Sequence, residues 1–167
     1  MIKPSITAAI FTKDKKQVLL IKRRDVPVWV LPGGGMEMNE SPEEAIIREV
    51  KEETGFDVSI TRKVGVYHPI NRLAKLTYLY ECEIYDGSAS NSDETKDVRF
   101  FPLTALPKYL PPPYEVWIDD AKKNLPQILE KKLTSVNYFS FFKHLFFHPI
   151  LVIRFLLSRA GLSINSR

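Results

Sequence analysis

The chain has 167 residues, of which 24 are Lys or Arg and 20 are Asp or Glu, giving a formal net charge of +4. This length is enough for one domain with a full core and too short for two typical domains. Cys82 is the single cysteine, which excludes an intramolecular disulfide, and the N-terminus lacks the pattern of a cleavable signal, so we expect a cytoplasmic protein.

Apolar runs and turn residues predict alternating strands and helices through most of the chain. We expect strands at residues 6–11, 18–22, 75–83 and 98–101, where apolar residues alternate or run continuously. One helix is predicted to begin near Ser41 and another to cover residues 115–124, after a cluster of prolines. This order of strands and helices is an α+β pattern.

The ends of the first helix are indicated by its capping residues. Ser41 suits the N-cap, Pro42 suits the first helical position, and Glu44 completes a capping box with Ser41. Gly55 follows the helical stretch, where glycine readily takes the left-handed conformation that ends a helix. We therefore expect the helix to lie between Ser41 and Gly55.

Three acids are predicted on one face of this helix. Glu49, Glu52 and Glu53 stand at i, i+3 and i+4, so their side chains project to the same side and repel one another. A divalent cation would offset this repulsion, and an all-oxygen ligand set suits magnesium, manganese or calcium better than zinc. The acids could also be the solvated face of a surface helix, which spacing alone does not exclude.

A longer pattern favours the metal site. Residues 33–56 read GGGMEMNESPEEAIIREVKEETGF, in which Gly34 is followed by five residues, Glu40, seven residues and then REVKEETGF. This segment resembles the Nudix box and matches each of its glycine and charged positions. Phe56 is aromatic where the family usually has an aliphatic residue, and Asn39 stands where glycine is common. Asparagine tolerates the left-handed conformation better than most residues, so the turn can form.

The resemblance extends beyond the box to WVLPGGG before it and FFPLTALP after it, and covers about residues 5–125. It implies the Nudix fold, a mixed β-sheet sandwiched between α-helices. It also implies an enzyme that uses water and Mg²⁺, or alternatively Mn²⁺, to cleave a nucleoside diphosphate linked to another moiety. The alternative is a binding module that recognises a nucleotide derivative without cleaving it. Retention of all three carboxylates favours the enzyme.

The resemblance further implies roles for individual residues. The implied metal ligands are the carboxylates of Glu49, Glu52 and Glu53 and the backbone carbonyl of Gly33, whereas Gly34, Glu40, Arg48 and Gly55 are structural positions of the motif. In particular, Arg48 and Glu40 are expected to hold the loop against the helix. The implied reaction is attack of water on a metal-bound diphosphate.

Two further site residues are predicted outside the box. In the family the general base is a box glutamate or an acid on a later loop, and Asp93, Glu94 and Asp97 are expected in such a loop. Glu94 is our candidate, although a polar run of this kind is more often a solvated turn. Arg23 could clamp a phosphate at the end of its strand, or it could belong to an exposed basic strand end. The identity of the substrate stays open.

The end of the chain differs from the rest in charge. No acidic residue follows Glu130, whereas six basic residues do: Lys131, Lys132, Lys143, Arg154, Arg159 and Arg167. Removing these six from the 24 basic residues leaves 18 against 20 acids, a net charge of −2, so the bulk charge does not indicate a nucleic-acid partner. We predict a Nudix domain over residues 1–130 and a basic, aromatic-rich tail over residues 131–167.

Apolar residues of the tail recur at helical spacing, which predicts an amphipathic helix within residues 133–160. Its apolar stripe consists of Phe139, Phe142, Phe146, Ile150, Ile153 and Leu157, and the opposite half carries Lys143, His144, His148, Arg154 and Arg159. This pattern is typical of a helix at a membrane surface, so peripheral contact with the inner membrane surface is one interpretation. The segment could also bind a partner, pack on its own domain or form a homodimer. Its internal charges and Pro149 argue against a transmembrane span.

Overall fold

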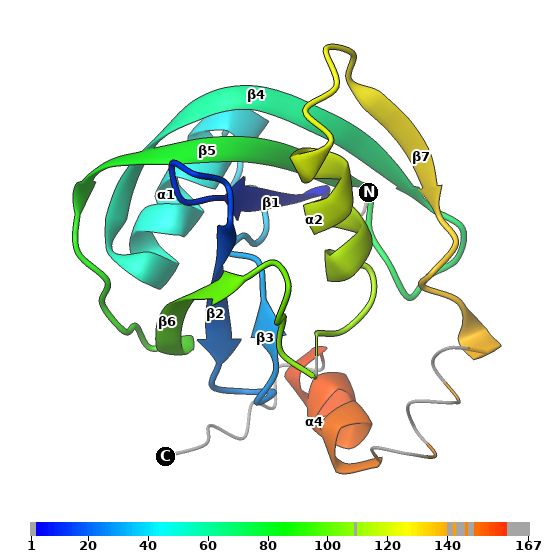
Figure 1. The fold of residues 1–167 in the computed structure, drawn as a ribbon. Coiled ribbons are helices and arrows are strands. Elements are labelled where there is room, and N and C mark those ends of the chain that lie inside the picture. The colour runs from blue at the N-terminus through cyan, green and yellow to red at the C-terminus, as the bar shows by residue number, and fades with distance from the viewer. Residues whose placement is uncertain (1–2, 109, 140–141, 143–145, 147–148, 160–167) are drawn as a thin grey trace.

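The computed structural model describes residues 3–108, 110–139, 142, 146 and 149–159. Its strands are β1 (Ser5–Ile10), β2 (Gln17–Arg23), β3 (Trp29–Val30), β4 (Phe56–Pro69), β5 (Thr77–Gly87), β6 (Thr95–Pro102) and β7 (Leu129–Leu133). Its helices are α1 (Pro42–Thr54), α2 (Tyr114–Lys122) and α4 (Pro149–Arg159). This mixture of elements, shown in Figure 1, confirms the predicted α+β class.

The strands form two sheets. The larger sheet has the order β1-β5-β4-β7 and is mixed, because β1 and β5 are parallel, β5 and β4 are antiparallel, and β4 and β7 are parallel. The smaller sheet has the order β3-β2-β6 and is antiparallel. Helices α1 and α2 lie on opposite sides of the larger sheet (Figure 1), so the expected mixed sheet between helices is confirmed.

Strand β1 separates two clusters of core residues, because successive side chains of a strand point to opposite faces. Ile6 and Ala8 pack in the same cluster as Ile46 of α1, whereas Ala9 packs in the other cluster with Trp117 of α2. A strand that is covered on both faces needs apolar residues at nearly every position. This explains why β1 reads as a continuous apolar run.

The predicted helix caps are confirmed at α1. The Ser41 hydroxyl accepts a hydrogen bond from the Glu44 N–H at 3.2 Å, and the Glu44 carboxylate accepts one from the Ser41 N–H at 2.9 Å. Gly55 takes the left-handed conformation with φ 79°, and its N–H donates to the Lys51 carbonyl at 2.9 Å. Local sequence therefore sets both ends of the helix that carries the acids.

Other elements differ from the predicted ones. The strand that the resemblance implies at the start of WVLPGGG is β3, but the sequence does not predict β4 or β7, and β4 is the longest strand of the described chain. Its pairing with β5 shifts register at three places, and such bulges break the alternation from which strands are predicted. β7 runs across the proposed boundary at residue 130 and pairs with β4. Asp97, expected in a loop, lies in β6 opposite Lys22.

Helix α4 contacts the turn that follows β2. The Arg154 Nε donates a hydrogen bond to the Asp25 carbonyl at 2.9 Å, and Val152 is only 8% exposed. The sequence places Arg154 on a polar half opposite the apolar stripe, but in the structure this residue faces the domain. Lys143, His144 and His148, expected on the same half, lie outside the described residues.

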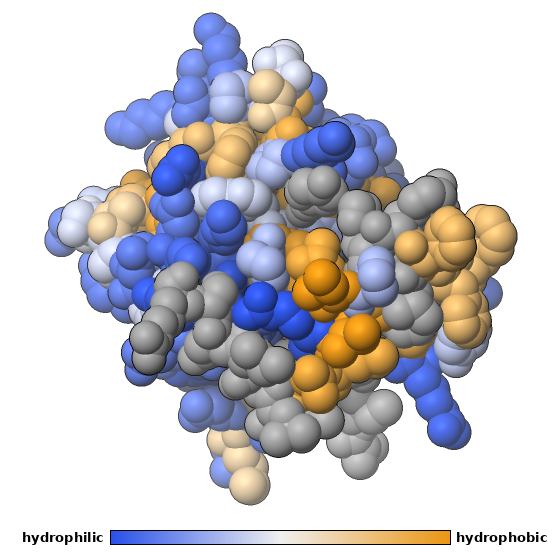
Figure 2. All heavy atoms as spheres, turned by 90° about the horizontal axis from the view of Figure 1, so that it is seen from below, coloured by the Kyte–Doolittle hydropathy of each residue, from blue (hydrophilic) through white to orange (hydrophobic). Residues whose placement is uncertain are grey.

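Most of the predicted apolar stripe is exposed. Five of its residues, Phe139, Phe142, Phe146, Ile150 and Ile153, are exposed and Leu157 is half-buried. Figure 2 shows orange hydrophobic surface on the face of the molecule that lies at the bottom of Figure 1, where α4 is found. Within the described ranges, no helix has the length and apolar character needed to cross a membrane.

A buried carboxylate ties β7 to α2. Asp120 is 1% exposed, and its two oxygens accept hydrogen bonds from Lys131 Nζ at 2.7 and 2.8 Å, from Lys123 Nζ at 2.9 Å and from the Tyr67 hydroxyl at 2.9 Å. Burial by itself raises the pKa of Asp120, but the hydrogen bonds from Lys131, Lys123 and Tyr67 outweigh it and lower the pKa below its usual value. The ionised carboxylate therefore stabilises the edge of the larger sheet.

We expect Asp120→Asn to lower the free energy of unfolding by about 1–3 kcal/mol, because the amide loses the charged hydrogen bonds from Lys131. The folded-state pKa of Asp120 is depressed, so its contribution is present above the unfolded-state pKa and is lost as the pH falls through the folded-state value. Urea unfolding at neutral pH and at acidic pH measures this difference, which should shrink in acid.

The matched control is Asp119→Asn, which makes the same change at the exposed neighbouring position. It should unfold like the unmodified protein. Equal stability of the Asp120→Asn and Asp119→Asn variants at neutral pH would contradict the role given to Asp120.

Candidate functional site

The glycine turn before α1 lies against both β1 and α1. Gly33 has φ 146°, and a Cβ on it would stand 2.2 Å from the Ile6 carbonyl oxygen. The Gly33 N–H donates to Glu53 Oε2 at 2.7 Å. A Cβ on Gly34 would stand 2.6 Å from the Glu49 carboxylate. The backbone contact therefore requires glycine at position 33, whereas Gly34 leaves the space that the flexible Glu49 side chain occupies.

Arg48 connects the acids of α1 to the loop before the helix. Its Nε and Nη2 donate to the Glu40 carboxylate at 2.8 and 3.0 Å, and its Nη2 also donates to the Gly35 carbonyl at 3.2 Å. Its Nη1 donates at 3.1 Å to both Glu49 Oε1 and Glu52 Oε2. These contacts support the proposed role of Arg48 in holding the loop against the helix.

Glu40 closes the same loop from the other side. Besides the bidentate pair with Arg48, its Oε2 accepts a hydrogen bond from the Glu37 N–H at 2.8 Å. The hydrogen bonds from Arg48, followed by the one from Glu37, lower the pKa of Glu40 to about 2, so the carboxylate is ionised at neutral pH. Asn39 has φ 66°, the left-handed conformation that the sequence predicts at this position.

The three acids of α1 differ in their surroundings. Glu53 is 8% exposed, whereas the Glu52 side chain is 59% exposed and Glu49 lies between them. Burial raises the pKa of Glu53 to about 8; the Gly33 N–H opposes this shift and the Glu49 charge adds to it. Burial also raises the pKa of Glu49, against the hydrogen bond from Arg48. A desolvated pair of carboxylates of this kind favours an added positive charge.

The charges of Glu94 and Arg23, which belong to other elements, act on these acids. The charge of Glu94, just before β6, raises the pKa of both Glu49 and Glu53, so its carboxylate is electrostatically coupled to the acidic helix. The charge of Arg23, at the end of β2, instead lowers the pKa of Glu53. Asp97 instead forms an ion pair within β6, with 2.6 Å between its Oδ2 and Nη2 of the arginine two residues later.

Two residues beside Arg23 are absent from the sequence prediction. Asp25 accepts hydrogen bonds from Arg23 Nε at 2.8 Å and from its Nη2 at 2.5 Å, and these bonds, together with the Asp25 charge, raise the pKa of Arg23. Burial raises the pKa of Tyr114 to about 12, with Arg23 lowering it and Glu53 raising it. The ion pair of Arg23 and Asp25 could have been predicted from the sequence, because the two opposite charges stand only two residues apart. Tyr114 has no such local signal, because α2 brings it from a distant part of the sequence.

The acids of α1 have the donor type of a metal site but do not surround one point. Among the residues that the structure describes, no group of three or more His, Cys, Asp or Glu side chains is arranged around a common point for a metal. Arg48 engages Glu49 and Glu52, and the Gly33 N–H engages Glu53. The donor set fits a hard divalent cation, because every side-chain donor is a carboxylate oxygen and Glu53 is buried among like charges.

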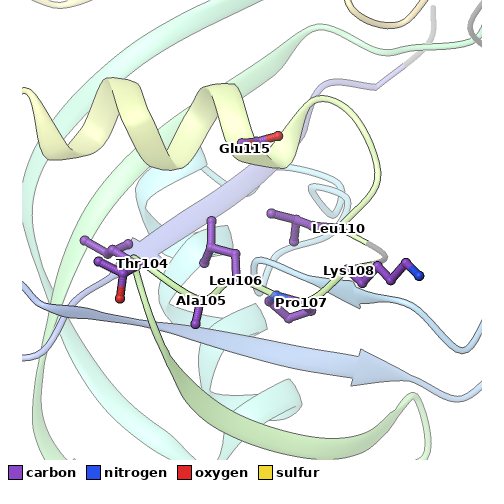
Figure 3. A pocket seen from close by; sticks show the side chains of 8 residues that line it. Thr104, Ala105, Leu106, Pro107, Lys108, Leu110 and Glu115 are labelled. Carbon is purple, nitrogen blue, oxygen red and sulfur yellow. The ribbon is translucent and has the colours of Figure 1, made fainter.

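A separate cavity of about 380 Å³ opens beside the start of α2. Figure 3 shows that most of its lining side chains come from the loop after β6, with Glu115 contributed by α2. The residues that line it are Leu103, Thr104, Ala105, Leu106, Pro107, Lys108, Leu110 and Glu115. None of the predicted site residues belongs to this lining, so the cavity is distinct from the acidic cluster.

Comparisons with known proteins agree with the resemblance to the Nudix family. A family model described as NUDIX domain matches residues 1–122. The chain is 34% identical over 120 residues to a Bacillus subtilis protein named "Putative 8-oxo-dGTP diphosphatase", covering 71% of this chain and 80% of that protein. It is 37% identical over 105 residues to an ADP-ribose pyrophosphatase of Methanocaldococcus jannaschii, covering 59% of this chain and 62% of that protein, less than two thirds of its length.

A solved structure has a similar fold. The crystal structure of an ADP-ribose pyrophosphatase from Streptococcus suis superimposes with a TM-score of 0.65 at 25% sequence identity. The similarity covers 79% of this chain and 99% of that chain. The comparison supports the arrangement of sheets and helices described above.

The three consecutive glycines should respond differently to alanine. Gly33→Ala should lower the free energy of unfolding by about 2 kcal/mol or more, because its Cβ would meet the Ile6 backbone at a positive φ. Gly34→Ala should change stability much less, since the flexible Glu49 side chain can move aside, but it should displace that carboxylate. Urea unfolding measures the first effect, and a crystal structure of the Gly34→Ala variant shows the second.

Gly35→Ala is the matched control, because no atom lies within 4 Å of its Cβ position apart from its chain neighbours. It should leave both stability and the Glu49 position unchanged. A loss of stability at Gly35 equal to that at Gly33 would contradict the close-approach explanation.

Proposed function

The chain belongs to the NUDIX family of hydrolases, which act on diphosphate linkages, and on this premise we propose that it is a metal-dependent pyrophosphohydrolase. Its proposed substrate is a nucleoside diphosphate linked to another moiety. The observation that carries this proposal is the set of acids on α1, with Glu53 buried and bonded to the glycine turn. Such an arrangement concentrates negative charge beside a turn that the rest of the fold holds in place.

We propose that Glu49, Glu52 and Glu53, together with the Gly33 carbonyl, would hold a divalent ion, Mg²⁺ or alternatively Mn²⁺. When bound, such an ion offsets phosphate charge and makes the attacking water more acidic. Glu53 is the best positioned of these ligands, because its contact with the Gly33 N–H fixes the carboxylate against the turn. Arg48 orients Glu49 and Glu52 from the side of the loop.

The reaction exchanges one phosphorus–oxygen bond for another. The water oxygen forms a bond to phosphorus, the bond from that phosphorus to the bridging oxygen breaks, and the water proton must be accepted by a base. We propose Glu94 for this role, because it lies in the loop before β6 and its charge is coupled to those of Glu49 and Glu53. A box glutamate is the alternative base.

Arg23 and Tyr114 are proposed to face the substrate from the opposite side of the acids. The support for this proposal is electrostatic, because the charge of Arg23 lowers the pKa of both Glu53 and Tyr114. Asp25 already engages Nε and Nη2 of Arg23, so a phosphate would contact the remaining Nη1 or displace Asp25. Asp25 is thus a candidate for setting the orientation of this guanidinium.

The names of the relatives support a class of substrate. Two of the relatives are named for ADP-ribose and one is named for 8-oxo-dGTP. Both compounds are nucleotide derivatives that contain a diphosphate linkage. We therefore propose a small nucleotide derivative rather than a nucleic acid as the substrate. A module that binds such a compound without cleaving it is the outcome that the following experiment must separate from catalysis.

We expect Glu53→Gln to lower kcat by about 100-fold or more, because the amide cannot supply the negative charge with which the Glu53 carboxylate would hold a divalent ion. The assay incubates the protein with Mg²⁺ and a panel of nucleoside triphosphates, nucleotide sugars, ADP-ribose and dinucleoside polyphosphates. Product is separated by chromatography with and without a chelator. Glu94→Gln in the same assay should lower kcat and change its pH profile.

Glu83→Gln is the matched control, since it makes the same chemical change at an exposed acid of β5. It should retain full activity. Calorimetric binding of a compound from the panel with no metal-dependent product would support the binding module and overturn the proposal of catalysis.

A further inference from the structure

Large apolar side chains are exposed along the tail more than elsewhere in the described chain. Among the residues that the structure describes, fourteen large hydrophobic residues are exposed, and eight of them lie between residues 138 and 156: Tyr138, Phe139, Phe142, Phe146, Ile150, Ile153, Phe155 and Leu156. Phe139 is 81% exposed and Ile150 is 72% exposed. A gathered apolar surface of this kind marks a site of contact with another molecule or a membrane.

Helix α4 has one face toward the domain and another toward solvent. At 100° per residue, Arg154, Leu151 and Val152 fall on the half that contacts the domain, in agreement with their burial and with the Arg154 bond to the Asp25 carbonyl. Ile150, Ile153 and Leu156 fall on the opposite half and are exposed. The helix is therefore held in place by one face, and its outward face is apolar.

The charge of the tail favours one kind of occupant. From residue 131 onward the sequence has six Lys or Arg residues and no acid, whereas residues 1–130 carry a net charge of −2. Apolar side chains with phenylalanines, set among cationic residues, complement a surface that is apolar inside and anionic at its boundary. The cytoplasmic leaflet of a membrane has this character, because its anionic lipids attract polybasic segments.

We propose that α4 and the exposed aromatic residues Tyr138, Phe139, Phe142 and Phe146 dock the protein on an anionic phospholipid surface. The outward face of α4 and the exposed aromatic residues before it enter the boundary between headgroups and acyl chains. Lys131 and Arg154 bond to the domain, so the other basic residues of the tail contact the anionic headgroups. The bond from Arg154 to the turn after β2 keeps the docked helix attached to the domain.

Two other occupants fit the observations less well. A second copy of the chain would bring two cationic tails together, and like charges in contact oppose association. The chain's own domain does not cover the stripe, because Phe139, Ile150 and Ile153 remain exposed in the described structure. An anionic lipid surface satisfies both the apolar face and the charge.

The test measures co-sedimentation of the full chain with vesicles of phosphatidylglycerol mixed with phosphatidylcholine. The chain should sediment with these vesicles and much less with pure phosphatidylcholine, and added salt should weaken binding by screening the charges. The triple variant Phe139→Ser, Ile150→Ser, Ile153→Ser should bind these vesicles at least about tenfold more weakly than the unmodified chain. The reason is that it removes apolar contact at exposed positions. Thermal unfolding checks that the variant is folded, and Phe139→Ser alone serves if it is not.

The matched control is the triple variant Tyr85→Ser, Ile70→Ser, Ile128→Ser, which removes one aromatic and two isoleucines exposed elsewhere on the domain. It should bind vesicles like the unmodified chain. Equal binding by the two triple variants would overturn the proposal, as would equal binding to neutral and anionic vesicles. A dimer in sedimentation velocity that the tail variant converts to monomer, without vesicle binding by either protein, would overturn it in favour of a second copy.

Discussion

The close approach of the glycine turn to β1 and α1 is the constraint on which the geometry of the site depends. Gly33 fits beneath the Ile6 carbonyl only because it lacks a side chain, and Gly34 leaves the space in which the Glu49 carboxylate lies. In return, the Gly33 N–H holds Glu53. The turn, the first strand and the acidic helix therefore form one packed unit, and this packing holds the charged groups in place.

Hydrogen bonds from neighbouring groups offset the repulsion between the acids of this unit. Arg48 bonds to Glu40, Glu49 and Glu52, which converts repulsion on one helical face into a network that also closes the loop. Glu53 instead accepts a hydrogen bond from a backbone N–H, that of Gly33. The result is a site in which three carboxylates are held by different means and have different exposure, although they belong to one short helix.

Features of the fold and the site could be predicted from the sequence where they depend on residues close together in the chain. The capping box at Ser41, the end at Gly55 and the left-handed Asn39 follow from residues close in sequence, and the structure shows each of them. Strand β4 could not be predicted in the same way, because its bulges break the alternation that marks a strand. The grouping of Glu94 with the acids of α1 likewise depends on how β6 packs.

The tail shows the same division. Its amphipathic period and its excess of positive charge can be predicted from the sequence, since both are properties of neighbouring residues. The orientation of the helix cannot, because a period does not say which half meets the domain. The structure turns Arg154 inward to the Asp25 carbonyl and leaves Ile150 and Ile153 outward. The sequence by itself thus determined the helix that carries the acids and the chemistry of the box, through local spacing. Only the tertiary structure decided which charges meet and which apolar face stays exposed, because those choices depend on contacts between distant segments.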